Sequence, residues 1–259
     1  MHRLIARLMC LGLVAFLTGC GGLDMSHANA GAPAGTGFQV REVSIDGQSH
    51  KYGLFIPHRY GKATPMPAIV FLHGLLQAGS DGEACMKQGL GPCIAKRPTT
   101  FPAIAIFPQS GGDWTGEARE KLALAVLDDV AAHYAVDRDR VVLTGLSNGG
   151  YGTWHIGADH PERFSALVPI AGQADLPSAS KLTGIPIWCF HNSGDVFVGV
   201  GAARSMVAQI RAAGSTQVQY TEFGAFGHGG WDQVYDDQKM LDWMLAQRIS
   251  TRGRVAATR

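Results

Sequence analysis

Short apolar runs alternate along this chain with longer stretches that have helical spacing. The apolar runs predict buried strands at residues 68–72, 103–107, 141–144, 166–170 and 185–190. The intervening stretches predict helices at residues 117–134, 151–160, 201–213 and 231–247. Strands that alternate with helices favour a mostly parallel central sheet with helices on both faces, so we expect an α/β protein.

Other stretches alternate between apolar and polar residues, as half-buried strands do. Residues 40–45 and 51–56 predict an opening strand pair with Asp46 and Gly47 in the turn, and residues 216–223 predict the last strand. The stretch 38–250 shows no internal repeat, and its length suits one α/β domain. We therefore predict a single domain at 38–250, followed by a short tail at 251–259.

The sequence Gly-Leu-Ser-Asn-Gly-Gly, residues 145–150, lies between a predicted strand and a predicted helix. Glycines on both sides allow a sharp turn that lifts the serine hydroxyl out of the sheet, at the amino end of the helix. The motif is weak by itself in a chain with 34 glycines. Its position makes Ser147 the candidate nucleophile.

A serine hydroxyl becomes a good nucleophile when an imidazole takes its proton and a carboxylate orients that imidazole. In a strand–turn–helix site of this kind the acid and then the histidine follow the serine, each just after a strand. Asp195 follows the strand at 185–190, and His228 follows the strand at 216–223. We predict Asp195 as the acid and His228 as the base, with Asp175 as the alternative acid.

Backbone N–H groups near Ser147 are expected to stabilise the oxyanion that forms during acyl transfer. Asn148 supplies one N–H by its position after the nucleophile, and Leu75, which follows His73 and Gly74, is expected to supply the other. We expect His73 to brace the loop that carries Leu75, and we expect His191 to stabilise the acid loop.

Two aromatic or polar side chains near predicted strand ends are candidates for substrate binding. Trp114 either lines the pocket or packs as an ordinary aromatic residue, and Gln109 is placed near the pocket because it ends a strand. Trp154 and Trp231, on or beside helices, are expected to belong to the core.

Several segments together resemble the phospholipase/carboxylesterase and "predicted peptidase" group of α/β-hydrolases, which is similar to secreted feruloyl and polyhydroxyalkanoate esterases. The segments that carry the resemblance are 71–74, 107–109, 145–154, 160–164, 185–195 and 228–232. The resemblance extends from about Tyr52 to Gln247. It implies an α/β-hydrolase fold and transfer of an acyl group to water, with no cofactor.

The amino terminus has the pattern of a signal peptide. A basic start is followed by ten largely apolar residues, 8–17, which is too short for a membrane-spanning helix. The sequence Leu-Thr-Gly-Cys ending at Cys20 resembles the lipobox of bacterial lipoproteins, although an ordinary secretory signal is the alternative. We expect residues 1–19 to be removed, Cys20 to be lipidated, and residues 20–37 to form a flexible tether.

Charge and cysteine content narrow the remaining possibilities. The formal net charge is +1 without a basic stripe, which argues against a nucleic-acid partner. Among five cysteines, Cys85 and Cys93 are candidates for a disulfide in an oxidising compartment, and Cys189 is expected to be a buried thiol. No Cys/His spacing predicts a zinc site, so we expect no metal.

The sequence therefore predicts a serine hydrolase that cleaves a carboxylic ester through an acyl-enzyme. We expect it at the bacterial cell envelope, attached to the membrane by its lipid and facing the periplasm or the exterior. A serine peptidase is the alternative enzyme. A non-catalytic envelope lipoprotein with the same fold is the alternative from another class.

Overall fold

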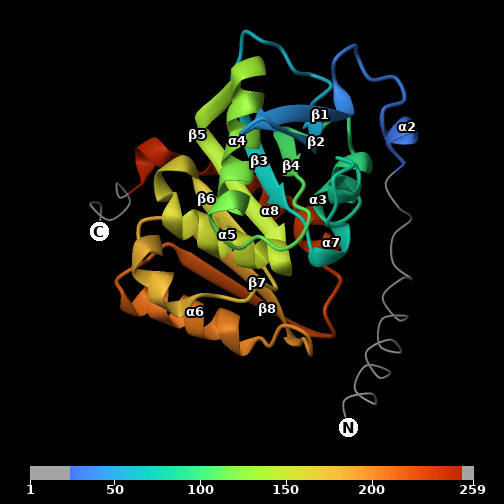
Figure 1. Ribbon diagram of the computed structural model, residues 1–259. Helices are drawn as coiled ribbons and strands as arrows, with labels where there is room; N and C mark the ends of the chain where they lie inside the picture. Colours follow the sequence, from blue (N-terminus) through green and yellow to red (C-terminus); the bar gives the residue numbers. More distant parts are fainter. Residues whose placement is uncertain (1–23, 253–259) are drawn as a thin grey trace.

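The computed structural model describes residues 24–252, which form an eight-stranded sheet between two layers of helices (Figure 1). The strand order is β1-β2-β4-β3-β5-β6-β7-β8. The strands are β1 Gly37–Ile45, β2 Gln48–Ile56, β3 Met66–Leu72, β4 Ile104–Pro108, β5 Val136–Leu146, β6 Ala166–Ile170, β7 Ile187–Gly194 and β8 Val218–Phe226. Strands β3 to β8 run parallel, whereas β2 is antiparallel to both β1 and β4. The predicted mostly parallel α/β sheet is confirmed.

Helices cover both faces of this sheet. The α-helices are α2 Met25–Ala28, α3 Leu90–Ala95, α4 Glu117–His133, α5 Asn148–Asp159, α6 Gly201–Ala212, α7 Asp232–Asp236 and α8 Gln238–Ala246. Short 3₁₀ helices are η2 Leu75–Gln77, η3 Ala84–Met86, η4 Pro161–Arg163, η5 Leu176–Leu182 and η6 Ile249–Thr251. Helices α4, α5 and α6 share one apolar core with the sheet, and α3, α7 and α8 share the other.

Alternation along each strand produces these two cores. In β3, Val70 and Leu72 face the core under α4 and α5, while Ile69 and Phe71 face the opposite core. Successive side chains of a strand point to opposite faces, so a continuous apolar run supplies both layers at once.

The antiparallel hairpin β1–β2 has the two-residue turn that the sequence predicts. Ile45 pairs with Gln48, and the two residues between them, Asp46 and Gly47, have φ values of 51° and 78°. Positive φ at both positions is the type I′ geometry, which glycine adopts without strain and aspartate tolerates.

The segment before β1 differs in part from the expected tether, because residues 25–28 form helix α2 and Asn29 is hydrogen-bonded to Phe38. The side chain of Asn29 donates to Phe38 O at 2.7 Å and accepts from Phe38 N at 2.6 Å, and Ala28 is buried. The predicted signal peptide and Cys20 lie outside the described residues. In residues 24–252, no helix combines the length and the apolar character that a membrane crossing needs.

The disulfide predicted between Cys85 and Cys93 is not formed. Both residues are free buried thiols on opposite sides of the turn before α3: Cys85 donates to Phe107 O at 3.3 Å, and Cys93 donates to Tyr235 O at 2.8 Å. Each sulfur therefore points toward a different neighbouring segment. Cys189 is a buried free thiol, as expected.

Candidate active site

Ser147 occupies a strained turn at the carboxyl end of β5. Its φ of 56° and ψ of −116° lie in a region that L-residues rarely adopt. The turn passes so close to β3 that a Cβ at Gly149 would overlap the carbonyl oxygen of Leu72. Only glycine fits there, which explains the glycine after the serine and places the hydroxyl above the edge of the sheet.

Ser147, His228 and Asp195 form a continuous chain of hydrogen bonds. Ser147 Oγ lies 2.7 Å from His228 Nε2, and His228 Nδ1 lies 2.6 Å from Asp195 Oδ2. A neutral imidazole with its proton on Nδ1 donates to the carboxylate and leaves Nε2 free to accept the serine proton. The structure thus brings together three residues that are separated by up to 81 positions.

The Asp195 carboxylate is fully buried yet well satisfied. Its second oxygen, Oδ1, accepts the backbone N–H groups of Phe197 at 3.0 Å and Val198 at 2.9 Å. Such bonds fix the orientation of the carboxylate toward the imidazole. Asp175, the alternative acid, is exposed in the loop after β6 and does not contact His228 in the described structure.

Neighbouring side chains hold the histidine loop in place. The Asn192 amide donates to Gly227 O and to Gly229 O, both at 3.0 Å. These two bonds fix the backbone on either side of His228. The buried ring of Trp231 meets the His228 ring edge-on at 5.7 Å. Sequence reasoning missed Asn192, although a polar residue near the carboxyl end of a buried strand was a usable signal.

His191 acts on the acid loop, as the sequence analysis expected of it. Its Nε2–H donates to Val198 O at 2.8 Å, and the same nitrogen is 3.4 Å from Asp195 Oδ2. The His191 side chain is fully buried. It therefore braces the turn that presents Asp195.

Leu75 and Asn148 are the first residues of η2 and α5, respectively. A helix provides no internal acceptor for the N–H groups of its first turn, so these two groups remain available at the site. Gly74 brings the two segments together: a Cβ there would lie 3.0 Å from a methyl group of Leu146, directly before the nucleophile. This is the arrangement that an oxyanion hole requires.

His73 supports the loop that carries Leu75. Its Nδ1 is 2.7 Å from Gly74 O, and its Nε2 accepts Ser110 N–H at 3.0 Å. Burial lowers the pKa of His73 below its ordinary value, although the bond to Gly74 O opposes this. The ring is therefore neutral at neutral pH, consistent with one donating and one accepting nitrogen.

The structure corrects the two side chains that the sequence suggested for substrate contact. Trp114 is fully buried and donates from Nε1 to His73 O at 2.9 Å. Gln109 is also buried; its Oε1 accepts Gly82 N–H at 2.6 Å, and its Nε2 donates to Gln77 O at 3.2 Å. Both side chains are used to hold loops together, so neither presents a surface to a substrate. Trp154, expected in the core, is buried there.

A second histidine–carboxylate group joins α4 to α5. Glu120 lies 3.0 Å from His155 Nε2 through one oxygen and 3.1 Å from His160 Nε2 through the other. Glu120, His155 and Asp159 each offer a donor atom within 4.8 Å of one another, so these are residues that could hold a metal ion. The sequence pattern alone does not predict this group, because its members come from different helices.

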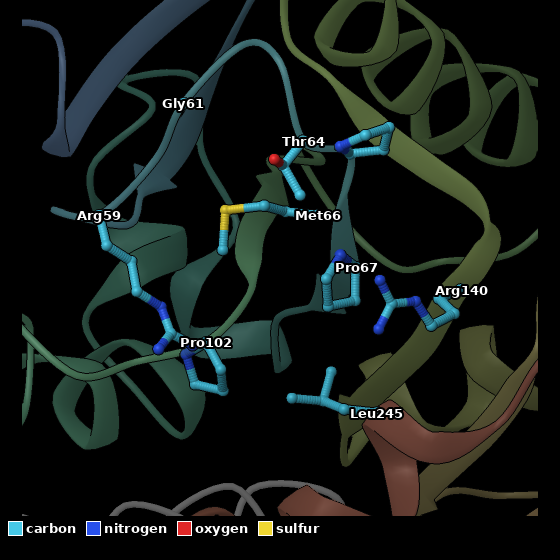
Figure 2. A pocket seen from close by; sticks show the side chains of 9 residues that line it. Arg59, Gly61, Thr64, Met66, Pro67, Pro102, Arg140 and Leu245 are labelled. Atoms are coloured by element: carbon cyan, nitrogen blue, oxygen red, sulfur yellow. The ribbon is translucent and has the colours of Figure 1, made fainter.

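A surface cavity lies at the opposite edge of the sheet, where β3, β4 and β5 begin (Figure 2). Figure 2 shows its lining side chains, which include Arg59, Met66, Pro67, Pro102, Arg140 and Leu245. Parallel α/β sheets place their reactive sites at the carboxyl ends of the strands, where Ser147, Asp195 and His228 lie. We therefore assign the candidate active site to the carboxyl edge and not to this cavity.

Comparison with solved structures identifies the fold. A thermostable esterase aligns with a TM-score of 0.75 and 28% identity over 82% of this chain and 63% of its own. The fold is that of the α/β-hydrolases. The Prolyl oligopeptidase family model matches residues 112–188, a segment of this fold that contains Ser147 and ends before Asp195.

Two of the sequence relatives are named as a depolymerase and a thioesterase. The chain is 31% identical over 127 residues to Poly(3-hydroxyalkanoate) depolymerase C of Paucimonas lemoignei, covering 43% of this chain and 29% of the depolymerase. It is 28% identical over 164 residues to Acyl-protein thioesterase 1 homolog 2 of Dictyostelium discoideum, covering 53% of this chain and 73% of the thioesterase. The chain spans less than half the length of four of the curated relatives that it matches.

Proposed function

We propose that this protein is a serine hydrolase that cleaves a carboxylic ester through an acyl-enzyme intermediate. The observation that carries the proposal is the chain of hydrogen bonds from Ser147 through His228 to the buried Asp195 carboxylate. Ser147, at one end of this chain of hydrogen bonds, has a positive φ. Beside it begin η2 and α5, and a helix provides no internal acceptor for the N–H groups of its first turn.

The reaction follows from this geometry. Ser147 Oγ attacks the ester carbonyl carbon while its proton moves to His228 Nε2, and the carbonyl oxygen becomes an oxyanion held by the Leu75 and Asn148 N–H groups. The tetrahedral intermediate collapses as His228 returns the proton to the leaving alkoxide oxygen, which departs as an alcohol. A water molecule then repeats the sequence on the acyl-enzyme and releases the carboxylic acid.

Asp195 assists this cycle without changing its own protonation. It keeps the His228 proton on Nδ1 and stabilises the imidazolium that forms at each step. Burial strengthens this interaction, because little solvent screens the charge. The backbone bonds from Phe197 and Val198 keep the carboxylate in place throughout.

The names of the relatives favour an ester over a peptide. The chain is similar to an esterase, a polyester depolymerase and a thioesterase, whereas the partial match to the Prolyl oligopeptidase family supports the alternative of a serine peptidase. Both reactions use the same triad. They differ in the leaving group, since an amine must be protonated more completely than an alkoxide before it departs.

A panel of p-nitrophenyl esters tested beside aminoacyl p-nitroanilides separates the two activities. We expect at least one ester to be turned over with kcat/KM above about 10⁴ M⁻¹s⁻¹, in the ordinary range for enzymes, and the anilides to be far slower. Efficient cleavage of the anilides would favour the peptidase. No covalent labelling by a fluorophosphonate would favour the non-catalytic alternative.

We also propose that the protein is a lipoprotein of the bacterial envelope, anchored through Cys20. The sequence supports this through its basic start, short apolar run and Leu-Thr-Gly-Cys ending. Asp24 already caps helix α2, so only three residues, 21–23, lie between it and Cys20. That length spans at most about 14 Å, which would hold the domain close to the membrane.

Phase separation in detergent tests the anchor. The full chain produced in a bacterial host should enter the detergent phase and carry an acyl mass on Cys20, whereas Cys20→Ser should not be acylated. Activity per folded molecule should be the same for a protein that starts at Asp24. An unmodified mature amino terminus at another residue would contradict the proposal.

A further inference from the structure

Four large apolar side chains lie exposed on two loops at the edge of the candidate active site. Leu75 and Leu76 follow β3 and are 59% and 75% exposed, and Val196 and Phe197 follow Asp195 and are 68% and 56% exposed. Clusters of exposed apolar side chains are uncommon on soluble proteins and mark surfaces that bind apolar partners. These loops approach the nucleophile from different strands, β3 and β7.

Phe197 lies on the histidine side of the site. Its ring centroid is 6.0 Å from that of His228, with the planes tilted by 51°. Its backbone N–H donates to Asp195 Oδ1, so the loop that presents the ring is tied directly to the catalytic carboxylate. A group bound against Phe197 is therefore held next to the imidazole.

Leu75 and Leu76 lie on the oxyanion side of the site. The backbone N–H of Leu75 is one of the two proposed oxyanion donors. The Leu75 side chain is attached to the neighbouring Cα and so lies next to the reacting carbonyl group. Leu76 is the next residue of the same turn, and the most exposed of the four.

The chemistry of the reaction gives each side a different partner. His228 must deliver a proton to the leaving oxygen, so the alcohol portion of the ester lies on the His228 side. The carbonyl carbon stays attached to Ser147 in the acyl-enzyme with its oxygen at Leu75 N–H, so the acyl portion extends from the oxyanion side.

We propose that Val196 and Phe197 bind an apolar alcohol group and that Leu75 and Leu76 bind an apolar acyl group. The preferred substrates are then uncharged esters with an apolar group on each side of the scissile bond. This inference rests on the proposed ester hydrolase function and names the substrate class of that same site.

Two ester series separate the roles of the two loops. The first varies the acyl group from acetyl to hexanoyl on a constant p-nitrophenyl alcohol. The second varies the alcohol from methyl to benzyl on a constant acetyl group, with acid release followed by titration. In the unaltered protein, kcat/KM should rise along both series.

Leu76→Ser and Phe197→Ser should affect opposite series. Loss of one apolar contact is worth about tenfold in specificity. Leu76→Ser should lower the hexanoyl-to-acetyl ratio of kcat/KM about tenfold and leave the benzyl-to-methyl ratio unchanged. Phe197→Ser should do the reverse. It should also leave the hydrolysis rate of a preformed acyl-enzyme unchanged, since the alcohol has already departed.

Leu245→Ser is the matched control, because Leu245 lines the cavity at the far edge of the sheet. It should leave both ratios as they are. Either variant changing the wrong ratio, or both ratios staying within twofold, would overturn the assignment of the loops. Failure of the proposed function is distinguishable: Ser147 would then not be labelled by a fluorophosphonate in any of the proteins.

Discussion

Two groups in this molecule pair histidine with a carboxylate. They differ in the burial of the carboxylate and in the partners of its oxygens. At the carboxyl edge of the sheet, Asp195 is fully buried and directs one oxygen to backbone N–H groups and the other to His228. Between α4 and α5, Glu120 is 14% exposed and directs its two oxygens to His155 and His160.

The comparison shows what a histidine and a carboxylate need before they can catalyse acyl transfer. The His228 ring has a hydroxyl at 2.7 Å on its far nitrogen, whereas the described contacts of His155 and His160 are with Glu120, Asp159 and the ring of Tyr151. Ser147 is also the N-cap residue of α5, and Gly74, which precedes η2, lies close to Leu146 beside it. Acyl transfer requires the nucleophile, the base and the oxyanion donors at one place. A histidine–carboxylate pair without them only joins two parts of the structure.

Removing the nucleophile should have the largest effect. Ser147→Ala should lower kcat on the best ester by a factor on the order of 10⁶, because the attacking oxygen is lost while binding and the oxyanion hole remain. Its thermal unfolding midpoint should stay close to that of the unaltered protein. Activity above about a tenth of the original would show that another residue attacks.

Exchanging one carboxylate in each group tests the comparison directly. Asp195→Asn should lower kcat by a factor on the order of 10⁴, because an amide donor favours the wrong imidazole tautomer. Glu120→Gln should leave kcat unchanged and cost about 1.5–3 kcal/mol in the free energy of unfolding, the usual range for a charged hydrogen bond. Asp175→Asn is a further control and should be silent; loss of activity there would make it the acid.

His73 extends the comparison to a histidine without a carboxylate. Burial lowers its folded-state pKa below the unfolded value of 6.5, so below that pH the unfolded chain binds the proton more readily. The stability contribution is therefore complete above pH 6.5 and is lost as the pH falls. In denaturant titrations from pH 7 to 5, His73→Asn should reduce the pH slope by up to about 1.4 kcal/mol per unit. An unchanged slope would contradict the neutral, buried state of the ring.

The thiols should give the smallest signal, since they are nucleophiles without a base. Burial raises the pKa of Cys85 to about 12 and that of Cys93 to about 12. In the native protein at pH 8, a thiol reagent such as Ellman's should react with neither on the time scale of minutes, and both should react after denaturation. Rapid reaction in the native state would show that this region opens.

The hydrogen-bonded contact among Ser147, His228 and Asp195 was predictable, because each residue is specified by local sequence and chain order. Ser147 lies in a glycine-flanked turn, and Asp195 and His228 each follow a recognisable strand. The sheet was predictable for the same reason. A short, continuous apolar run such as residues 68–72 has the length and composition of a buried strand.

Features that depend on neighbours distant in sequence were not predictable in the same way. Trp114 and Gln109 lie at the predicted edge of the sheet. Hydrogen bonds with His73 O, Gln77 O and Gly82 N–H, however, hold both side chains inside the protein. Residues 231–247 have one helical pattern, yet Asp237 adopts an extended conformation and separates α7 from α8, where it caps the second helix. Helix α3 was missed because glycine and proline in its first turn resemble a loop, although proline is tolerated there.

Mapping the covalent intermediate tests the central claim most directly. The protein is mixed with a slowly deacylating p-nitrophenyl ester, quenched in acid within seconds, digested and analysed by mass spectrometry. We predict one acyl group per molecule on the peptide that contains Ser147, with no adduct in Ser147→Ala and accumulation in step with the burst of p-nitrophenol. An acyl group on another residue, or hydrolysis without any adduct on Ser147 under these conditions, would contradict the account.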